Sequence, residues 1–121
     1  MTWNIDGAAP VYLQLADSIR YAIICGEFPK GSRIASVREL SSDAKVNPNT
    51  MQRALFELER EGLIMTHGTS GKFVTGEDSI IAAARQSALS ALTEDLTKRA
   101  AALGFTAEEV ISHIRERSTG E

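Results

Sequence analysis

The chain has 121 residues, of which 43% are hydrophobic and 24% are charged, and this composition is typical of a small globular protein. The length suits one domain, or a small domain with an appended element, and excludes a barrel or a doubly wound enzyme. No apolar run is long enough to span a membrane, and the single Cys25 cannot form an internal disulfide. Because no basic segment precedes an apolar stretch, we expect a cytoplasmic protein without a membrane partner, in which Cys25 is a small core residue.

The formal net charge of −3 is unpromising for a protein that binds nucleic acid, but the charge is unevenly distributed. Residues 1–76 contain eight basic and eight acidic side chains, so this part of the chain is neutral. The excess of acidic residues lies in residues 77–121. The overall acidity is therefore a property of the C-terminal part.

The first predicted elements are a helix and an irregular segment. Pro10 suits the first turn of a helix, and apolar residues recur after it at helical spacing as far as Gly26. Two glycines and one proline in residues 26–34 predict a turn that leads into an extended pair at Arg33 and Ile34.

Two further helices are predicted, joined by a three-residue connection. Ser36 and Glu39 have the spacing of a capping box, in which each side chain bonds to the backbone N–H of the other, and they predict a short helix. Asn47 can cap the next helix with Pro48 at its first position, and Gly62 ends it. The residues of this third helix predicted to be buried are Met51, Ala54, Leu55 and Leu58.

The pattern changes after the third helix from helical to extended. Two β-prone runs, 63–66 and 72–75, flank the glycine-containing loop 67–71, and this arrangement predicts a β-hairpin. Three helices followed by a hairpin describe a winged helix-turn-helix. The predicted fold class is therefore mainly α with a small β-hairpin, and we place the winged helix-turn-helix domain at residues 1–76.

The remaining residues, 77–121, predict two more helices. Ser79 can cap a long helix that ends near Gly104, and Thr106 with Glu109 forms a second capping box that opens a short last helix. The long helix carries a coiled-coil-like apolar seam that the rest of the chain does not obviously cover, so we predict a helical dimerisation tail. The residues predicted to form the dimer interface are Leu89, Leu92, Leu96 and Leu103 of the long helix and Ile111 and Ile114 of the last helix.

The first turn of the helix that follows Asn47 contains the candidate DNA-reading residues. In a helix-turn-helix the second helix presents its N-terminal side chains to the major groove, while the preceding helix crosses the backbone. Amide side chains can pair with adenine, arginine with guanine, and threonine with a phosphate or a thymine methyl. The alternative for this helix alone is a solvated polar face on a helical bundle. The candidate residues are Asn49, Thr50, Gln52 and Arg53.

No enzymatic site is predicted. Residues 68–72 have two residues between their glycines instead of four, and Phe73 follows the lysine, so they do not match a phosphate-binding loop. Cys25, His67 and His113 are isolated in the sequence, and a zinc site would have to assemble from all three without a local motif. We therefore expect no catalytic residues, no cofactor and no metal, and we expect His113 on the polar face of the last helix.

Several motifs occur in a fixed order between residues 10 and 74. They are Pro-Val-Tyr-Leu-Gln-Leu at 10–15, Gly-Glu-Phe-Pro-Lys-Gly at 26–31, Ser-Val-Arg-Glu-Leu at 36–40, Val-Asn-Pro-Asn-Thr-Met-Gln-Arg-Ala-Leu at 46–55, Leu-Glu-Arg-Glu-Gly-Leu-Ile at 58–64 and Gly-Lys-Phe-Val at 71–74. In this order they resemble the GntR family of bacterial transcription regulators. The tail, with Leu-Gly-Phe-Thr at 103–106 and Glu-Glu-Val-Ile at 108–111, is similar to that of the YtrA-like subfamily.

This resemblance implies contacts between the chain and double-stranded DNA. The residues that it implies are Ser36 and Arg38 at the phosphate backbone or a base edge, Asn49, Thr50, Gln52 and Arg53 in the major groove, and His67, Gly68 and Lys72 of the hairpin at the adjacent minor groove. Two positions depart from the family pattern. Ala35 stands where a proline is usual, and the hairpin loop lacks the usual arginine, for which His67 and Lys72 are the candidate substitutes.

We expect a homodimeric, sequence-specific transcription regulator, a repressor, because two modules on one two-fold axis add their contacts on a pseudo-palindromic operator. The resemblance further suggests control of a transporter operon. A small-molecule effector of unknown identity would have to act at the dimer interface or against the hairpin, since the tail is too small for a separate ligand-binding domain. The alternative is a winged-helix protein–protein interaction module without DNA binding, which the overall acidity favours.

Overall fold

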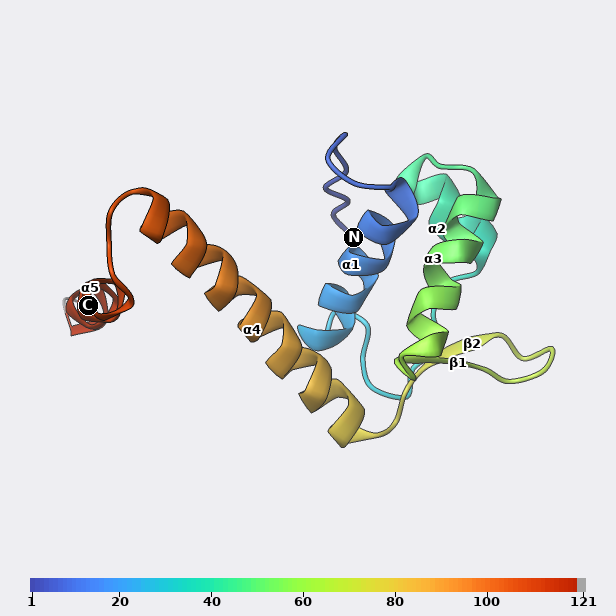
Figure 1. The fold of residues 1–121 in the computed structure, drawn as a ribbon. Helices are drawn as coiled ribbons and strands as arrows, with labels where there is room; N and C mark the ends of the chain where they lie inside the picture. Colours follow the sequence, from blue (N-terminus) through green and yellow to red (C-terminus); the bar gives the residue numbers. More distant parts are fainter. Residues whose placement is uncertain (120–121) are drawn as a thin grey trace. The chain divides into compact units, whose positions relative to one another are not determined.

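The computed structural model describes residues 1–119, and these form five helices and one two-stranded antiparallel hairpin. The predicted fold class, mainly α with a small hairpin, is confirmed. Figure 1 shows helices α1 to α3 packed together, with the loop of the hairpin projecting away from them. The elements are α1 (Val11–Ile24), α2 (Val37–Ala44), α3 (Pro48–Arg60), β1 (Ile64–Thr66), β2 (Lys72–Val74), α4 (Asp78–Ala102) and α5 (Ala107–Thr119).

The chain divides into two compact units, Met1–Ala84 and the residues from Arg85 onward. The first unit contains α1, α2, α3, the hairpin and the start of α4. It extends past residue 76, the predicted end of the DNA-binding domain, because Ile81 is buried in its core and Ile80 and Ala84 pack against that core.

The core of the first unit lies where α1 and α3 pack against each other and against the hairpin. The four α3 residues that were predicted to be buried are all fully buried, so the prediction for this helix is confirmed. Burial of these side chains provides most of the stability of such a small unit, since apolar burial is the dominant favourable contribution to folding. The largest fully buried apolar side chains are Leu15, Ile19, Met51, Leu55, Leu58, Leu63, Ile64 and Val74.

The start of α3 has the predicted cap. The side chain of Asn47 accepts a hydrogen bond from the backbone N–H of Asn49 at 2.7 Å, and Pro48 is the first helical residue. Such a cap is worth about 1 kcal/mol. The chain leaves the end of α3 through Gly62, whose φ of +79° lies in the left-handed region. These local signals account for the agreement between the predicted and observed bounds of the helix.

The two predicted capping boxes differ in the structure. At α5 both bonds form, from the Glu109 N–H to the Thr106 hydroxyl at 3.2 Å and from the Thr106 N–H to the Glu109 carboxylate at 3.0 Å. At α2 the Glu39 N–H donates to the Ser36 hydroxyl at 3.1 Å, but the Glu39 carboxylate accepts from that hydroxyl rather than from the Ser36 backbone. Only half of the box predicted at α2 is therefore formed.

Two predictions about single residues are wrong. Ser79 does not cap α4, because the helix already begins at Asp78, where the buried Thr75 hydroxyl accepts a bond from the Glu77 N–H at 3.1 Å and sets the preceding turn. Cys25 is exposed rather than part of the core. It is the C-terminal cap of α1, at the point where the chain leaves the helix through Gly26.

The hairpin has a third extended segment beside it. Ile64 pairs with Val74 and Thr66 with Lys72 in the hairpin itself. Arg33 forms an antiparallel bridge with Phe73, so the predicted extended conformation at this point is confirmed. This segment therefore holds the chain between α1 and α2 against the hairpin. We call the hairpin, β1 to β2 with its loop, the wing.

Candidate nucleic-acid interface

Helices α2 and α3 are joined by residues 45–47, as predicted. Lys45 has a φ of +58°, the one positive value outside glycine among the described residues, and the Val46 N–H donates to the carbonyl of Ser41 at 3.0 Å. This turn reverses the chain sharply while Leu40 on α2 and Ala54 on α3 remain buried. The Lys45 side chain is left exposed at the corner of the helix-turn-helix.

The candidate reading residues of α3 lie on its outer side. Asn49, Gln52 and Arg53 are exposed and Thr50 is half-buried, whereas Met51, between them, is fully buried. This alternation follows from the helical period, which places residues three and four apart on one face. The first turn of α3 therefore presents two amides, one hydroxyl and one guanidinium to solvent.

Tyr12 on α1 is a neighbour of this surface that the sequence reasoning missed. The guanidinium carbon of Arg53 lies 3.8 Å from the centre of the Tyr12 ring, within the range of a cation–π interaction. Val11, Tyr12, Asn49, Thr50 and Arg53 together line a shallow hollow of about 380 Å³. In the sequence Tyr12 is only part of the motif at 10–15, and it is the packing of α1 on α3 that brings it to Arg53.

Carboxylates gather at the opposite end of α3, and each has a basic partner. Glu57 pairs with Arg60 at 3.0 Å, and Glu61 pairs with Arg20 of α1 at 2.6 Å. The hydrogen bond from Arg20 to Glu61 is the main reason that the pKa of Arg20 is raised. This end of α3 is thus locally neutralised, and it lies away from the candidate reading residues.

Glu59 belongs to the same carboxylate group and reaches the hairpin. Its carboxylate accepts hydrogen bonds from the Lys72 ammonium and, at 2.8 Å, from the Thr66 hydroxyl. Partial burial acts to raise the pKa of Glu59, but these two hydrogen bonds outweigh it and hold the pKa below its ordinary value. Lys72, one of the predicted DNA contacts, is therefore engaged by the protein itself.

The basic side chains of residues 1–76 separate into two sets. Four of them form ion pairs with carboxylates, namely Arg20, Lys30, Arg60 and Lys72. For the other four, no carboxylate of residues 1–119 lies within 4.0 Å, and all of them are exposed; these are Arg33, Arg38, Lys45 and Arg53. We call this second set the unpaired basic residues. They belong to α2, to α3, to the turn between these helices and to the segment that leads into α2.

Two of the unpaired basic residues were predicted to contact DNA and two were missed. Arg38 and Arg53 were predicted, and Arg38 is exposed in the first turn of α2 beside the Ser36 cap. Lys45 lies in the connection between the helices, and Arg33 lies in the segment beside the hairpin. Neither missed residue belongs to a motif. Both are recognised as candidate DNA contacts only because the structure places no carboxylate of residues 1–119 within 4.0 Å of them.

The other predicted wing residues are exposed at the loop of the hairpin. The His67 ring packs edge-on against Phe73 at 5.0 Å between ring centres, and Gly68 has a φ of +52°. The His67 side chain remains exposed to solvent beside this contact.

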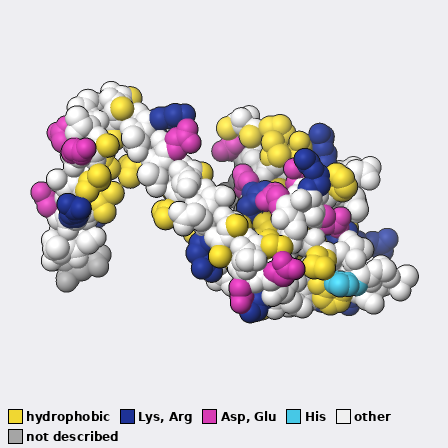
Figure 2. Space-filling model, turned by 60° about the horizontal axis from the view of Figure 1, so that its bottom comes forward, with side chains coloured by type: hydrophobic (Ala, Val, Ile, Leu, Met, Phe, Trp, Pro, Cys, Tyr) yellow, Lys and Arg dark blue, Asp and Glu magenta, His cyan; other side chains and the backbone are white. Residues whose placement is uncertain are grey.

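The tail has an apolar surface that is exposed in the single chain. Figure 2 shows hydrophobic side chains in yellow on its surface, between acidic groups in magenta. None of the described residues of α5 is buried. The predicted interface residues are exposed by 56% at Leu89, 67% at Leu92, 46% at Leu96, 77% at Leu103, 45% at Ile111 and 49% at Ile114.

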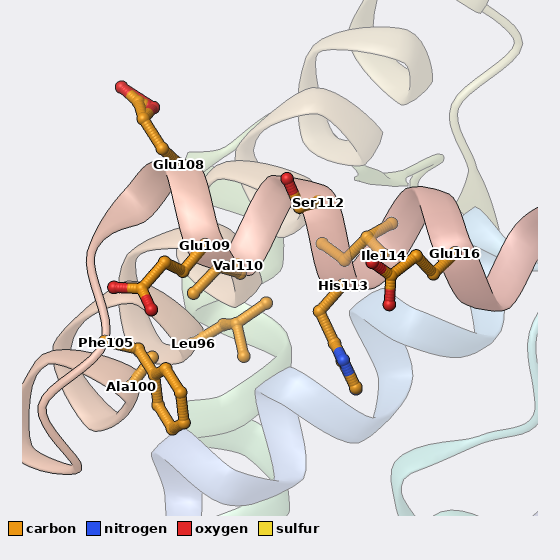
Figure 3. Close-up of a pocket in the computed structure, with 10 residues that line it drawn as sticks. All are labelled: Leu96, Ala100, Phe105, Glu108, Glu109, Val110, Ser112, His113, Ile114 and Glu116. Atoms are coloured by element: carbon orange, nitrogen blue, oxygen red, sulfur yellow. The ribbon is translucent and has the colours of Figure 1, made fainter.

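Part of this surface forms a groove of about 540 Å³ between α4 and α5. In Figure 3 the Leu96 side chain lies next to Val110 and Phe105 lies next to Ala100, whereas Glu108 points away. The predicted interface residues Leu96 and Ile114 line the groove, and Ile111 does not. Val110 of α5 also lines the groove and is half-buried, whereas Ile111 and Ile114 are exposed.

Within residues 1–119, no three histidine, cysteine, aspartate or glutamate side chains lie together as a metal site would require. None of the helices in the same range has the length and apolar character needed to cross a membrane.

Comparison with known proteins identifies the family. The family described as bacterial regulatory proteins, gntR family, matches residues 11–74, which cover α1 to the end of the hairpin. The HTH-type transcriptional regulator YhcF of Bacillus subtilis is 35% identical over 117 residues, 97% of each chain. The HTH-type transcriptional repressor YtrA of the same organism is 35% identical over 68 residues, 56% of this chain and 52% of YtrA.

A solved structure extends the similarity through the tail. The GntR family transcriptional regulator from Listeria monocytogenes has a TM-score of 0.84 and 32% identity, covering 93% of this chain and 98% of that one. Three observations indicate the same family. They are the winged helix-turn-helix fold, the family match over α1 to β2 and the similarity to YhcF over 97% of each chain. The chain belongs to the GntR family of bacterial regulatory proteins, which are DNA-binding transcription regulators and not enzymes.

Proposed function

We propose that this protein is a repressor that binds a pseudo-palindromic operator as a homodimer. The observation that carries the DNA-binding surface is the position of the unpaired basic residues. All four belong to the helix-turn-helix or to the segment that leads into it, while the carboxylates at the end of α3 are neutralised. Phosphates are bound by unpaired cations, since each neutralised phosphate releases counterions.

Within this surface we assign positioning and reading to different helices. Arg38, exposed at the start of α2, contacts the phosphate backbone together with the Ser36 hydroxyl. Base reading falls to the first turn of α3, through Gln52, Arg53 and the two residues Asn49 and Thr50. His67 and Gly68 approach the adjacent minor groove at the tip of the wing.

The dimer follows from the apolar surface of the tail. A stripe of exposed leucines on α4 continues into exposed isoleucines on α5, and such a contiguous surface marks an interaction site. A second copy of the chain offers the same stripe, and an isologous contact between the two would bury both at once. Two DNA-binding units joined in this way read two half-sites related by a two-fold axis.

Similarity to other proteins supports the proposal that this protein represses transcription and the choice of its target. YtrA of Bacillus subtilis is named a repressor, and this chain is 35% identical to it over the region that the two share. On the resemblance to YtrA-like regulators we propose a transporter operon as the target. A repressor whose operator overlaps a promoter lowers transcription when it binds, so reporter expression should rise when the gene is deleted.

Selection of bound DNA from a random pool tests the proposal most directly. We expect an enriched sequence with two inverted half-sites, because each half of a homodimer reads the same bases. Light scattering on the same preparation should give the mass of a dimer. Enrichment of a single half-site would contradict the dimer, and enrichment of no sequence would favour the interaction module without DNA binding.

A further inference from the structure

The basic residue of the hairpin is not free to contact DNA. Lys72 is the single lysine or arginine between residues 63 and 75. Its ammonium donates to the Glu59 carboxylate and, at 2.9 Å, to the Thr66 hydroxyl, and its side chain is 19% exposed. A phosphate would have to compete with a carboxylate that already satisfies this charge. The wing therefore lacks an available cation of its own.

Arg33 is attached to the hairpin by its backbone. It bridges Phe73, and two hydrogen bonds flank this bridge, from the Ile34 N–H to the Lys72 carbonyl at 3.0 Å and from the Val74 N–H to the Ser32 carbonyl at 2.8 Å. The segment thus continues the hairpin as a third extended strand. The backbone of Arg33 is therefore held beside β2 by these two hydrogen bonds.

The Arg33 side chain runs along the hairpin toward its loop. A Cβ atom on Gly71 would lie 2.9 Å from the Arg33 Nε and 3.2 Å from one of its terminal nitrogens, so the guanidinium rests against the bare Cα of this glycine. Gly71 also has a φ of +109°, which glycine adopts without strain. The guanidinium is exposed, and no carboxylate of residues 1–119 lies within 4.0 Å of it.

We propose that Arg33, and not Lys72, supplies the positive charge with which the wing binds the phosphates that border the minor groove. This inference rests on the proposed DNA-binding function and deepens it. A guanidinium held against a glycine is presented without losing much side-chain freedom on binding, and it can bond two phosphate oxygens at once. Gly71 acts as the positioning residue, because any side chain there would displace the guanidinium.

The salt dependence of binding separates Arg33 from its neighbours. Binding of the full chain to the selected operator duplex is measured at increasing salt for Arg33→Gln, Lys72→Gln and Arg60→Gln. Each variant removes one positive charge from the same unit, so the net charge is matched. Arg33→Gln should lower the slope of log affinity against log salt by about one for each protomer, since one phosphate contact contributes about 0.9. Lys72→Gln and Arg60→Gln should keep the parental slope.

Two additional variants test the geometry. Arg33→Lys keeps the charge and should keep most of the slope, and Gly71→Ala should lower the slope although it removes no charge. Thermal melting is recorded for every variant, because Gly71→Ala also strains the hairpin. If Gly71→Ala is unfolded, Arg33→Gln with Arg33→Lys still decides the assignment.

Arg38→Gln distinguishes failure of this inference from failure of the proposed function. A parental slope for Arg33→Gln beside a lowered slope for Arg38→Gln overturns the role of Arg33 and leaves the helix-turn-helix as the DNA-binding surface. A lowered slope for Lys72→Gln alone assigns the wing charge to Lys72 and likewise overturns the inference. If the parent shows no salt-dependent binding to any duplex, the proposed function itself is wrong.

Discussion

Arg53 of α3 is stacked on the ring of Tyr12, with its guanidinium carbon 3.8 Å from the ring centre. The tyrosine comes from the first turn of α1, 41 positions earlier in the chain, and both residues line the same shallow hollow. Stacking on one face of the guanidinium leaves its edge free for hydrogen bonds. An arginine held in this way loses little conformational freedom when it meets a base or a phosphate.

Replacing Tyr12 with leucine should therefore affect DNA binding through Arg53. The half-exposed stack contributes about 0.5 to 1 kcal/mol to stability, so melting should change little. Affinity for the selected operator should fall, and the loss should be absent when Arg53 is already alanine. A double-mutant cycle measured by binding checks this coupling. Additive losses in the two variants would show that Tyr12 does not position Arg53.

Neighbouring residues of α3 should separate folding from reading. Met51→Ala should destabilise the first unit by about 2 to 5 kcal/mol, because this side chain is fully buried. Gln52→Ala should leave the melting temperature unchanged and lose about 1 to 3 kcal/mol at its preferred base pair. The measurements are thermal melting and binding to matched and single-mismatch duplexes. Equal binding of Gln52→Ala to every duplex would remove this residue from the reading set.

Charges placed on the leucine stripe of α4 should separate the dimer. Leu92→Glu with Leu96→Glu should give monomers, since two carboxylates would be buried against apolar partners at a cost of several kcal/mol. Both leucines are exposed in the single chain, so the fold of each chain should survive. Ser87→Glu with Ala91→Glu adds the same charge on the opposite face of the helix and should leave the mass unchanged.

Light scattering at micromolar concentration reads out this pair of double variants. A monomeric mass for the parent at that concentration would contradict the proposed dimer. Loss of the dimer in the control variant as well would show that charge, rather than the leucine stripe, controls assembly.

The contact of Glu59 with the hairpin should make stability depend on pH in a defined direction. The pKa of Glu59 is held below its ordinary value of about 4.5, so the folded state favours the ionised form. Its contribution is present above the ordinary value and is lost as the pH falls through the lower value of the folded state. Glu59→Gln should therefore melt lower than the parent near pH 7, and the difference should shrink in acid.

The expected size of this effect is about 1 kcal/mol or less, as for other partly exposed ion pairs. Melting temperatures of parent and variant across the acid range provide the measurement. In the Lys72→Gln background the same substitution should have a smaller effect, because one of the two hydrogen-bond donors is gone. A constant difference between parent and variant at every pH would rule out ionisation of Glu59 as its cause.

The sequence by itself determined two features of α3. These are the alternation of buried and exposed residues and the positions at which the helix begins and ends. Asn47, Pro48 and Gly62 act on the backbone within a few residues of themselves, so their effect can be read locally. Local signals also have limits, because at α4 the Ser79 side chain was an acceptable cap. The buried Thr75 nevertheless sets the turn at Glu77, and the helix starts two residues earlier than a Ser79 cap requires.

The electrostatic character of the candidate interface was decided only by the tertiary structure. Lys72 belongs to a recognised motif, yet packing of the hairpin on α3 pairs its ammonium with the carboxylate of Glu59, 13 positions away. Arg33 belongs to no motif, yet the strand bridge to Phe73 carries it to Gly71 and leaves it without a carboxylate partner. Sequence shows which charges a chain has. Which of them remain unpaired depends on distances between residues far apart in the chain, because Coulombic attraction and hydrogen bonding act through space.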